Sequence, residues 1–432
     1  MMSEIEMMSA VALRDQIASG QMSATALVER CVARIEAREA DVQAWEWFEA
    51  DYALDQAKAL DEVFAAGGVK GPLHGLPVGL KDVIDTADAP TGNGCPVDAG
   101  RTPEKDARLV SMLRDAGAIV MGKTVSTELA FMHAGKTRNP HDPAHTPGGS
   151  SSGSAAAVGD GMIPLAVGTQ TGGSVIRPAS FCGITGFKPT LNAIPRAGVC
   201  MQSHTLDTVG VFGATPADTA LIASAMYQGD VLEADLTPMV PTRLALLHPP
   251  GWEDATEDLH AAFARVEAAL GERVRRAALP PVFDDAADQR AIVNFAEMAH
   301  YYDRYREAGL ERLGPETQKA MADGAATPAT DYIAALAAGQ EMRRGLKALF
   351  EEADFLICPA ATGPAPEGLA FTGDSIFNGL WTFTGVPAVT VPIEKAASGL
   401  PIGVQIVGAK GQDQDVLRAA QWLCDWHASG RA

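Results

Sequence analysis

Short apolar segments alternate with segments of helical periodicity along the whole chain, and no linker-like change of composition interrupts them. The clearest apolar segments are PVGL at 77–80, AIVM at 118–121 and, nearer the C-terminus, DFLICPA, VPAVTVPI and LPIGVQIVG. Strands that alternate with helices are typical of α/β proteins, in which helices pack on a sheet. We therefore predict one α/β domain over residues 1–432 rather than two domains.

Helices are expected in residues 9–66 and again between about 215 and 350. The first two follow serine caps in SAVALRDQIASG and SATALVERCVARIEAREA, with apolar residues at three- and four-residue steps. In TEDLHAAFARVEAALG, Thr256 is the expected cap and Gly271 the expected end. Residues 140–215 are expected to be mostly loops because glycine is frequent there.

The net charge of −20 narrows the range of partners. Nucleic acid binding is not expected, because phosphates need a basic surface, and an anionic substrate would need a local cation. No apolar run reaches about 18 residues, so no membrane span is expected, and the start, MMSEIEMMSA, does not resemble a signal peptide. The six scattered cysteines lack a CxxC pair and indicate reduced thiols in a cytoplasmic protein.

Three short motifs match known sites in letters but not in context. GAIVMGKT, at 117–124, fits the P-loop pattern, but a helix precedes it and a strand occupies its middle, so nucleotide binding is disfavoured. GSSSG, with Ser151 at its centre, fits the nucleophile turn of a Ser-His-Asp esterase, but the prolines before it exclude the strand that this turn needs. His141 and His145 have metal-ligand spacing, but Pro143 breaks the helix between them, and no metal site is expected.

A second glycine-rich turn, TQTGGS, ends at Ser174, twenty-four residues after Ser150 in GGSSSGSAAAV. Consecutive glycines before a serine allow several backbone N–H groups to point into one small space. Acyl-transfer enzymes need such donors to stabilise the oxyanion of a tetrahedral intermediate.

Together these segments resemble the amidase signature family. The similarity rests on residues 148–158, on 168–174, on FCGITGFKPT after them and on GLPVGLKDVIDT before them, and weaker agreement covers nearly the whole chain. The resemblance implies a central twisted mixed β-sheet with α-helices on both faces. It also implies four parts: N-terminal helices at 1–66, a catalytic core at 67–215, a variable helical region that shapes the substrate pocket at 215–350, and completing strands and a helix at 351–432.

The resemblance also implies a Ser–cis-Ser–Lys catalytic set without metal or cofactor. Ser174 matches the nucleophile, Ser150 the serine that follows a cis peptide bond, and Lys81 the base. The backbone N–H groups of the turn match the oxyanion hole, which comprises Thr171, Gly172, Gly173 and Ser174. Ser151, with Gly148 and Gly149, matches the structural support of the site, and Ser152 and Ser154 are expected to satisfy backbone groups of the turn.

The chemistry of the residues agrees with this assignment. A serine hydroxyl is a weak nucleophile without a base, and lysine at its usual pKa of about 10.4 is protonated. Lys81 follows the apolar segment LPVGL, where burial would lower its pKa. The alternative is a surface lysine paired with Asp82. Because a cis peptide before a non-proline residue needs enforcing surroundings, we expect the stretch around Ser150 to be buried and rigid.

Two departures from the family pattern bear on the substrate. Gln170 stands where many members have aspartate, and Arg177 lies three residues after the nucleophile instead of two. This variant resembles the malonamidase-like branch, in which that arginine is associated with a substrate carboxylate. The alternative for Arg177 is a structural ion pair with a buried aspartate. Aromatic residues in 294–305 and 374–385 either line the acyl pocket or belong to the core.

The resemblance predicts a hydrolase of small carboxamides, for example malonamate, that forms an acyl-enzyme and works as a cytoplasmic homodimer. An A-type subunit of a glutamine-dependent aminoacyl-tRNA amidotransferase is the second hypothesis. A carbamate or ureido C–N hydrolase with the same residues is the third.

Overall fold

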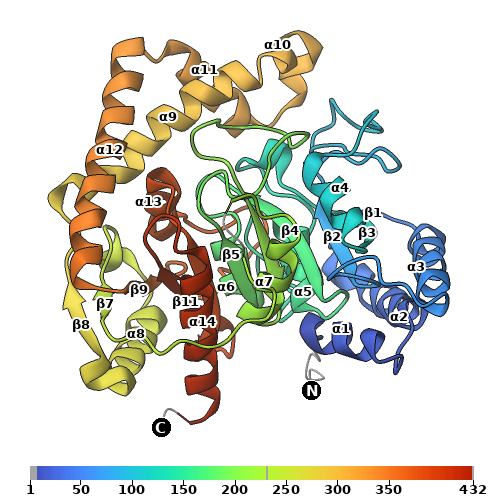
Figure 1. Cartoon of the computed structure of the whole chain (residues 1–432). Helices are drawn as coiled ribbons and strands as arrows, with labels where there is room; N and C mark the ends of the chain where they lie inside the picture. Colours follow the sequence, from blue (N-terminus) through green and yellow to red (C-terminus); the bar gives the residue numbers. More distant parts are fainter. Residues whose placement is uncertain (1–6, 230–231, 431–432) are drawn as a thin grey trace.

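Eleven strands form one mixed sheet in a computed structural model that describes residues 7–229 and 232–430 (Figure 1). Their order in the sheet is β1-β3-β2-β4-β6-β5-β10-β11-β9-β7-β8. The strands are β1 (Trp45–Phe48), β2 (Pro77–Lys81), β3 (Ile119–Thr124), β4 (Leu165–Gln170), β5 (Thr185–Lys188), β6 (Thr208–Gly213), β7 (Leu244–Leu247), β8 (Val274–Ala277), β9 (Phe355–Pro359), β10 (Ala388–Lys395) and β11 (Pro401–Val407).

Helices pack on both faces of this sheet, as the family resemblance predicts. Both α6 and α7 contact β5, but α6 packs with α5, whereas α7 packs with α1 and α14. The helices are α1 (Ala10–Ala18), α2 (Ala24–Val42), α3 (Ala50–Ala65), α4 (Arg108–Asp115), α5 (Ser152–Gly159), α6 (Ile176–Cys182), α7 (Pro216–Ser224), α8 (Glu257–Leu270), α9 (Ala286–Tyr301), α10 (Arg304–Gly309), α11 (Pro315–Ala326), α12 (Ala329–Glu352), α13 (Ile376–Thr384) and α14 (Asp413–Ala428).

Local signals explain several helix ends. The hydroxyl groups of Ser9, Ser23 and Thr256 accept hydrogen bonds from backbone N–H groups in the first turns of α1, α2 and α8. Such caps satisfy donors that have no partner within the helix. Gly271 follows α8 with a positive φ of 55°, which suits glycine. The predicted caps of these three helices and the predicted end of α8 are therefore confirmed.

The expected distribution of loops was wrong in two places. Residues 140–215 contain β4, α5, α6, β5 and β6, because their glycines allow elements to approach closely instead of forming loops. The helical region between 215 and 350 also contributes β7 and β8, and the N-terminal helical part contains β1. These three strands have four residues each, and pairing with neighbours in the sheet stabilises them.

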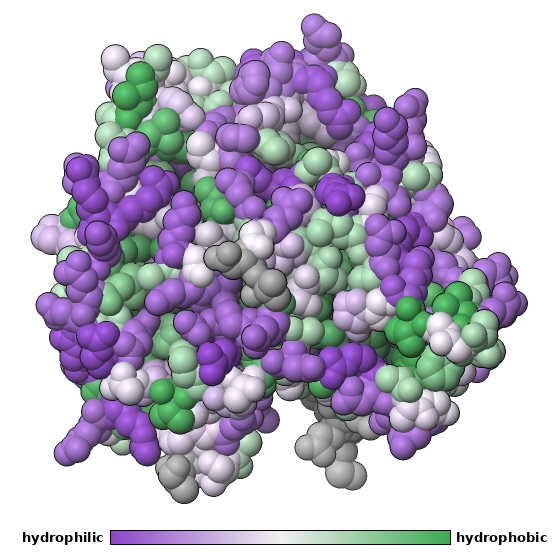
Figure 2. All heavy atoms as spheres, viewed as in Figure 1, coloured by the Kyte–Doolittle hydropathy of each residue, from purple (hydrophilic) through white to green (hydrophobic). Residues whose placement is uncertain are grey.

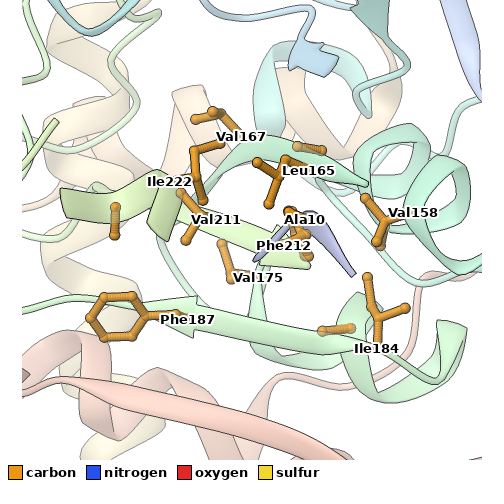
Figure 3. Packing of buried hydrophobic residues seen from close by; sticks show 14 of the residues in the cluster. Ala10, Val158, Leu165, Val167, Val175, Ile184, Phe187, Val211, Phe212 and Ile222 are labelled. Atoms are coloured by element: carbon orange, nitrogen blue, oxygen red, sulfur yellow. The ribbon is translucent and has the colours of Figure 1, made fainter. Parts of the chain in front are cut away.

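The centre of the sheet is packed with aliphatic and aromatic side chains (Figure 3). Val167 of β4, Val211 of β6 and Phe187 of β5 are buried there, with Val175 between the strands and α6. Burial of such side chains stabilises by about 1.5–3 kcal/mol each. This core fixes the ends of β2 and β4, where the catalytic motifs lie.

Polar and charged side chains cover most of the surface seen in Figure 2. Among the described residues, no helix combines the length and the hydropathy that crossing a bilayer requires. The six cysteines are free thiols. The prediction about a signal peptide concerns the first residues, of which 1–6 lie outside the described part of the chain.

Candidate active site

The three motifs meet at one edge of the sheet. Lys81 is the last residue of β2, and the turn at 171–174 directly follows β4. Because β2 and β4 are parallel neighbours, their carboxyl ends lie at the same edge. The segment that contains Ser150 leads into α5, which packs against both strands.

Lys81 is fully buried and reaches a serine hydroxyl. Its Nζ donates hydrogen bonds to Ser150 Oγ at 2.7 Å and to Thr169 Oγ1 at 2.8 Å. Burial lowers the pKa of Lys81 to about 7, although the nearby carboxylate of Asp207 opposes this change. Asp82 instead faces Lys123 at 3.9 Å. The alternative of a surface lysine paired with Asp82 is therefore wrong.

The segment from Gly148 to Ser154 is entirely buried, as predicted. The Gly149–Ser150 peptide is cis, which the family resemblance also predicts. Gly148 has a φ of 82°, and a Cβ atom at Gly149 would lie 2.8 Å from Thr372 Cγ2. A Cβ atom at Gly153 would lie 2.2 Å from the carbonyl oxygen of Ala44. Glycine is thus required by close approach as well as by conformation.

The neighbouring serines bind strands rather than substrate. Ser151 Oγ donates to the carbonyl oxygen of Thr169 at 3.1 Å and accepts from the N–H of Thr169 at 3.2 Å. Ser152 Oγ donates to the Val125 carbonyl oxygen at 3.3 Å, and Ser154 Oγ donates to that of Val167 at 3.0 Å. The expectation that Ser152 and Ser154 bond to the turn itself is wrong, because α5 packs directly on β3 and β4.

The turn after β4 is held by Gln170. Its Oε1 accepts from the N–H groups of Val175 and Ile176 at 2.9 and 3.1 Å, and its Nε2 donates to Thr382 Oγ1 at 3.0 Å. The hydroxyl of Thr382 in turn donates to the carbonyl oxygen of Gly172 at 3.0 Å. A neutral amide at position 170 therefore supplies both an acceptor and a donor to the turn.

A buried carboxylate fixes the other side of the turn. Thr171 Oγ1 donates to Asp207 Oδ1 at 2.6 Å, and Asp207 Oδ2 accepts from the N–H groups of Gln202 and Ser203 at 2.7 and 2.9 Å. Within the described chain, the backbone N–H groups of the four turn residues 171–174 donate to no backbone acceptor. These donors are thus available to an oxyanion.

A cavity of about 210 Å³ opens at this turn. Thr171, Gly172, Gly173 and Ser174 line it, and Ser174 is 8% exposed. Ser174 Oγ forms no hydrogen bond with Ser150 Oγ among the bonds of the described residues, unlike the Lys81–Ser150 pair. Catalytic hydrogen bonds are often long without substrate and shorten when it binds. Ser174 thus lines the cavity, and the hydrogen-bonded pair of Ser150 and Lys81 is buried.

A profile of the Amidase family matches residues 26–417. The chain belongs to the Amidase family. It is therefore a hydrolase of C–N bonds, and its α/β fold with one mixed sheet is that of solved amidases.

Relatives of this amidase match it over nearly its full length. The A-type subunit of glutamyl-tRNA(Gln) amidotransferase from Chloroflexus aurantiacus is 31% identical over 480 residues, which cover 99% of this chain and 98% of the relative. Among solved structures, one amidase is 29% identical, with a TM-score of 0.89, over 97% of this chain and 99% of that one. The peptide amidase of Stenotrophomonas maltophilia is 27% identical, with a TM-score of 0.85, over 97% of each chain.

Arg177 lines the cavity of the amidase and is buried. Its Nε donates to the carbonyl oxygen of Thr372 at 2.7 Å, and its Nη2 donates to that of Gly149 at 2.7 Å and to Thr372 Oγ1 at 3.3 Å. Its Nη1 has no partner in the described part of the molecule. All these partners are neutral, so the alternative of a structural ion pair with a buried aspartate is wrong.

The motifs that match other sites have structural roles. Lys123 of the P-loop-like sequence is buried in β3, where its Nζ donates to Thr91 Oγ1 at 2.6 Å. His141 Nε2 lies 2.9 Å from the Cys182 carbonyl oxygen, and His145 Nδ1 lies 3.1 Å from Asp142 Oδ2. No group of three or more potential metal ligands occurs in the described residues.

The two aromatic segments divide between cavity and core. Phe295 lines the cavity, whereas Phe377 and Trp381 are buried in the hydrophobic core. Sequence reasoning missed Thr169, Asp207 and Thr382, and it also missed Arg290, which α9 brings to the cavity. For Thr169 and Asp207 the only available sequence signal is a polar residue near a motif. The sequence offers no such signal for Arg290.

Proposed function

We propose that this amidase hydrolyses a small carboxamide through Ser174, Ser150 and Lys81. The observation that carries the proposal is the 2.7 Å hydrogen bond between Lys81 Nζ and Ser150 Oγ in a buried setting that lowers the pKa of the lysine to about 7. A lysine that loses its proton near neutral pH can act as a general base. The assignment of the three residues agrees with the family resemblance described above.

Acylation begins with neutral Lys81. Ser174 Oγ attacks the amide carbonyl carbon while its proton moves to Ser150 Oγ and the Ser150 proton moves to Lys81 Nζ. The backbone N–H groups at 171–174 stabilise the resulting oxyanion, and one such donor contributes about 3 kcal/mol. The C–N bond then breaks. The leaving nitrogen takes a proton from Ser150, which is replaced from Lys81, and acyl-Ser174 remains.

Deacylation uses the same groups, with water in place of the Ser174 hydroxyl as the nucleophile. Water attacks the ester carbon of acyl-Ser174, and its proton passes through Ser150 to Lys81. The ester C–O bond breaks, Ser174 Oγ recovers a proton by the same route, and the carboxylic acid leaves. This sequence is complete with protein groups and water, without a metal or cofactor.

The substrate of this proposal carries a carboxylate, as malonamate does. Support comes from Arg177, which lines the same cavity as Ser174 and whose buried guanidinium has neutral partners and a partnerless Nη1 among the described residues. A buried charge without an anion is unfavourable, so an anionic ligand would be bound well. The cavity of about 210 Å³ is smaller than the roughly 300–1,000 Å³ typical of sites for drug-sized ligands, which favours a short acyl group. These features agree with the malonamidase-like branch.

A panel of amides, esters, ureas and carbamates tests the proposal with wild-type protein and Ser174→Ala side by side. We expect hydrolysis of small amides by the wild type and at least a 1,000-fold loss in the variant. Turnover that survives in Ser174→Ala would refute the nucleophile. Preference for ureas or carbamates would favour the carbamate or ureido hydrolase instead.

Arg177→Ala separately tests whether the protein binds a carboxylate of the substrate. We expect kcat/KM for malonamate to fall at least tenfold more than kcat/KM for a neutral amide of similar size. Equal losses on both substrates would remove carboxylate binding from the proposal.

The 31% identity to the A-type subunit of glutamyl-tRNA(Gln) amidotransferase favours a second candidate function, that of an ammonia-delivering subunit of such an enzyme. Glutamine would then be the amide substrate, and a partner chain would receive the ammonia. Hydrolysis of glutamine in preference to other small amides by the purified chain would support this function. The cytoplasmic homodimer and the four-part division of the chain remain predictions.

A further inference from the structure

A second arginine, Arg290 of α9, lines the same cavity as Ser174 and Arg177. Its Nε is buried and has no hydrogen-bond partner among the described residues. The residue as a whole is partly exposed, but a buried guanidinium nitrogen without a partner is uncommon. Its placement therefore requires an explanation.

Two glycines make room for this guanidinium. A Cβ atom at Gly379 in α13 would lie 2.5 Å from Arg290 Nε, and a Cβ atom at Gly172 in the oxyanion turn would lie 3.5 Å from Arg290 Nη1. The guanidinium thus lies between α13 and the turn that precedes the nucleophile. It is held by close packing beside the cavity that the turn lines.

Arg177 and Arg290 repel each other across this space. Burial lowers the pKa of Arg177 to about 10, and the charge of Arg290 contributes to this decrease. Burial also lowers the pKa of Arg290. Asp374 Oδ1 accepts from the N–H of Ile376 at 2.9 Å. The Asp374 carboxylate attracts both arginines and opposes both decreases, without a hydrogen bond to either in the described structure. An anion between the two guanidinium groups would relieve the repulsion.

We infer that Arg290 and Arg177 together bind a carboxylate on the acyl part of the substrate, which rests on the proposed function. Lys81 and Ser150, which return the proton to the leaving nitrogen, do not line the cavity in the described part of the chain. The inference places the acyl part of the substrate in this cavity, which the oxyanion turn and both arginines line. The substrate class is the monoamide of a short dicarboxylic acid, and Arg290 determines specificity from the variable helical region.

Binding to the Ser174→Ala protein tests this inference without turnover. The ligands are malonate, succinate and neutral malonamide, and calorimetry gives their Kd values. We expect Arg290→Gln to raise the Kd of at least one dicarboxylate tenfold or more and to change the Kd of malonamide less than threefold. Unchanged dicarboxylate affinity in Arg290→Gln would overturn the inference.

Arg343→Gln is the matched control. Arg343 is an exposed arginine whose guanidinium also has neutral partners, since it donates to the carbonyl oxygens of Thr384 and Phe383, but it does not line the cavity. We expect this variant to bind dicarboxylates as the parent does. Equal losses in both arginine variants would show a general effect of net charge or folding and would overturn the inference.

Gly379→Ala provides a second variant that keeps every charge. Alanine is favourable in a helix, and its Cβ must displace the flexible Arg290 side chain. We expect weaker dicarboxylate binding with an unchanged Kd for malonamide.

If dicarboxylates require Arg290 but no amide is hydrolysed, the anion site stands and the proposed function fails. If amides are hydrolysed and dicarboxylates bind without Arg290, the proposed function stands and the inference about Arg290 fails.

Discussion

Lys81 Nζ donates a 2.7 Å hydrogen bond to Ser150 Oγ, although the two residues come from different segments of the chain, 69 positions apart. Thr169 Oγ1 accepts the second hydrogen bond of the same amine. No carboxylate of the described residues forms an ion pair with Lys81 within 4.0 Å, whereas Lys123 on the neighbouring strand has Asp82 at 3.9 Å. The pair is therefore arranged to lose a proton from the lysine near neutral pH.

The pH profile of hydrolysis should report Lys81. Because burial lowers its pKa to about 7, the neutral base is lost below that pH, and kcat/KM for a neutral amide should fall about tenfold per pH unit there. Above about pH 8 the rate should be constant. Steady-state kinetics between pH 5 and 9 measures this, and a rate that rises as the pH falls would contradict it.

Lys188→Met controls for the identity of the titrating lysine. Burial also lowers the pKa of Lys188 to about 7, but its Nζ donates to the carbonyl oxygens of Pro189 and Val386. We expect this variant to keep the wild-type midpoint, and we expect Lys81→Met to lose at least 1,000-fold in kcat/KM.

Lys81→Met should stabilise the fold near neutral pH. Lys81 has a folded pKa of about 7, below its unfolded value, so between these values the unfolded chain binds the extra proton and stability rises with pH. Methionine removes this cost, by about 4 kcal/mol at pH 7 on the scale of about 1.4 kcal/mol per pKa unit. Denaturant unfolding of both proteins at pH 7 and pH 10 measures the difference, which should shrink at pH 10. A variant less stable than wild type at pH 7 would argue against a desolvated lysine.

Ser151→Ala should reduce activity only partly, in contrast to Ser174→Ala. The hydroxyl of Ser151 bonds both the N–H and the carbonyl oxygen of Thr169, so its removal should lower the free energy of unfolding by about 1–2 kcal/mol. It should also loosen Thr169, whose hydroxyl is the second acceptor of the Lys81 amine. We expect kcat/KM to fall about 10- to 100-fold. Complete loss in Ser151→Ala with activity retained in Ser174→Ala would make Ser151 the nucleophile.

Gly153→Ala should prevent stable folding. Its Cβ would lie 2.2 Å from the Ala44 carbonyl oxygen and 2.3 Å from the Val125 N atom, and neither backbone can move without displacing a strand. We expect a loss of more than about 3 kcal/mol, measured as thermal unfolding or insoluble expression. Gly411→Ala is the control, because no atom of the described residues lies within 4 Å of its added Cβ and its φ of 88° alone should cost about 1 kcal/mol. Similar stability of the two variants would contradict the packing argument.

Local sequence was sufficient to predict the elements and residues whose evidence lies within a single segment. The strand at 77–81, the helix between Thr256 and Gly271 and the catalytic positions follow from apolar patterns, caps and family motifs. The strand at Leu244–Leu247 did not follow, since LALL suits a helix equally well and only its parallel pairing with β8 and β9 makes it a strand.

The sequence by itself thus determined the α/β class, the family and the residues that carry the proposed chemistry, because these depend on patterns within short stretches. Tertiary structure decided between a desolvated Lys81 and a surface lysine, and it decided that Arg177 has only neutral hydrogen-bond partners among the described residues. It also decided that Arg290, which lies more than 110 residues after Arg177 in the chain, lines the same cavity as Ser174 and Arg177. Burial and charge pairing depend on which distant segments meet, and no local pattern records that.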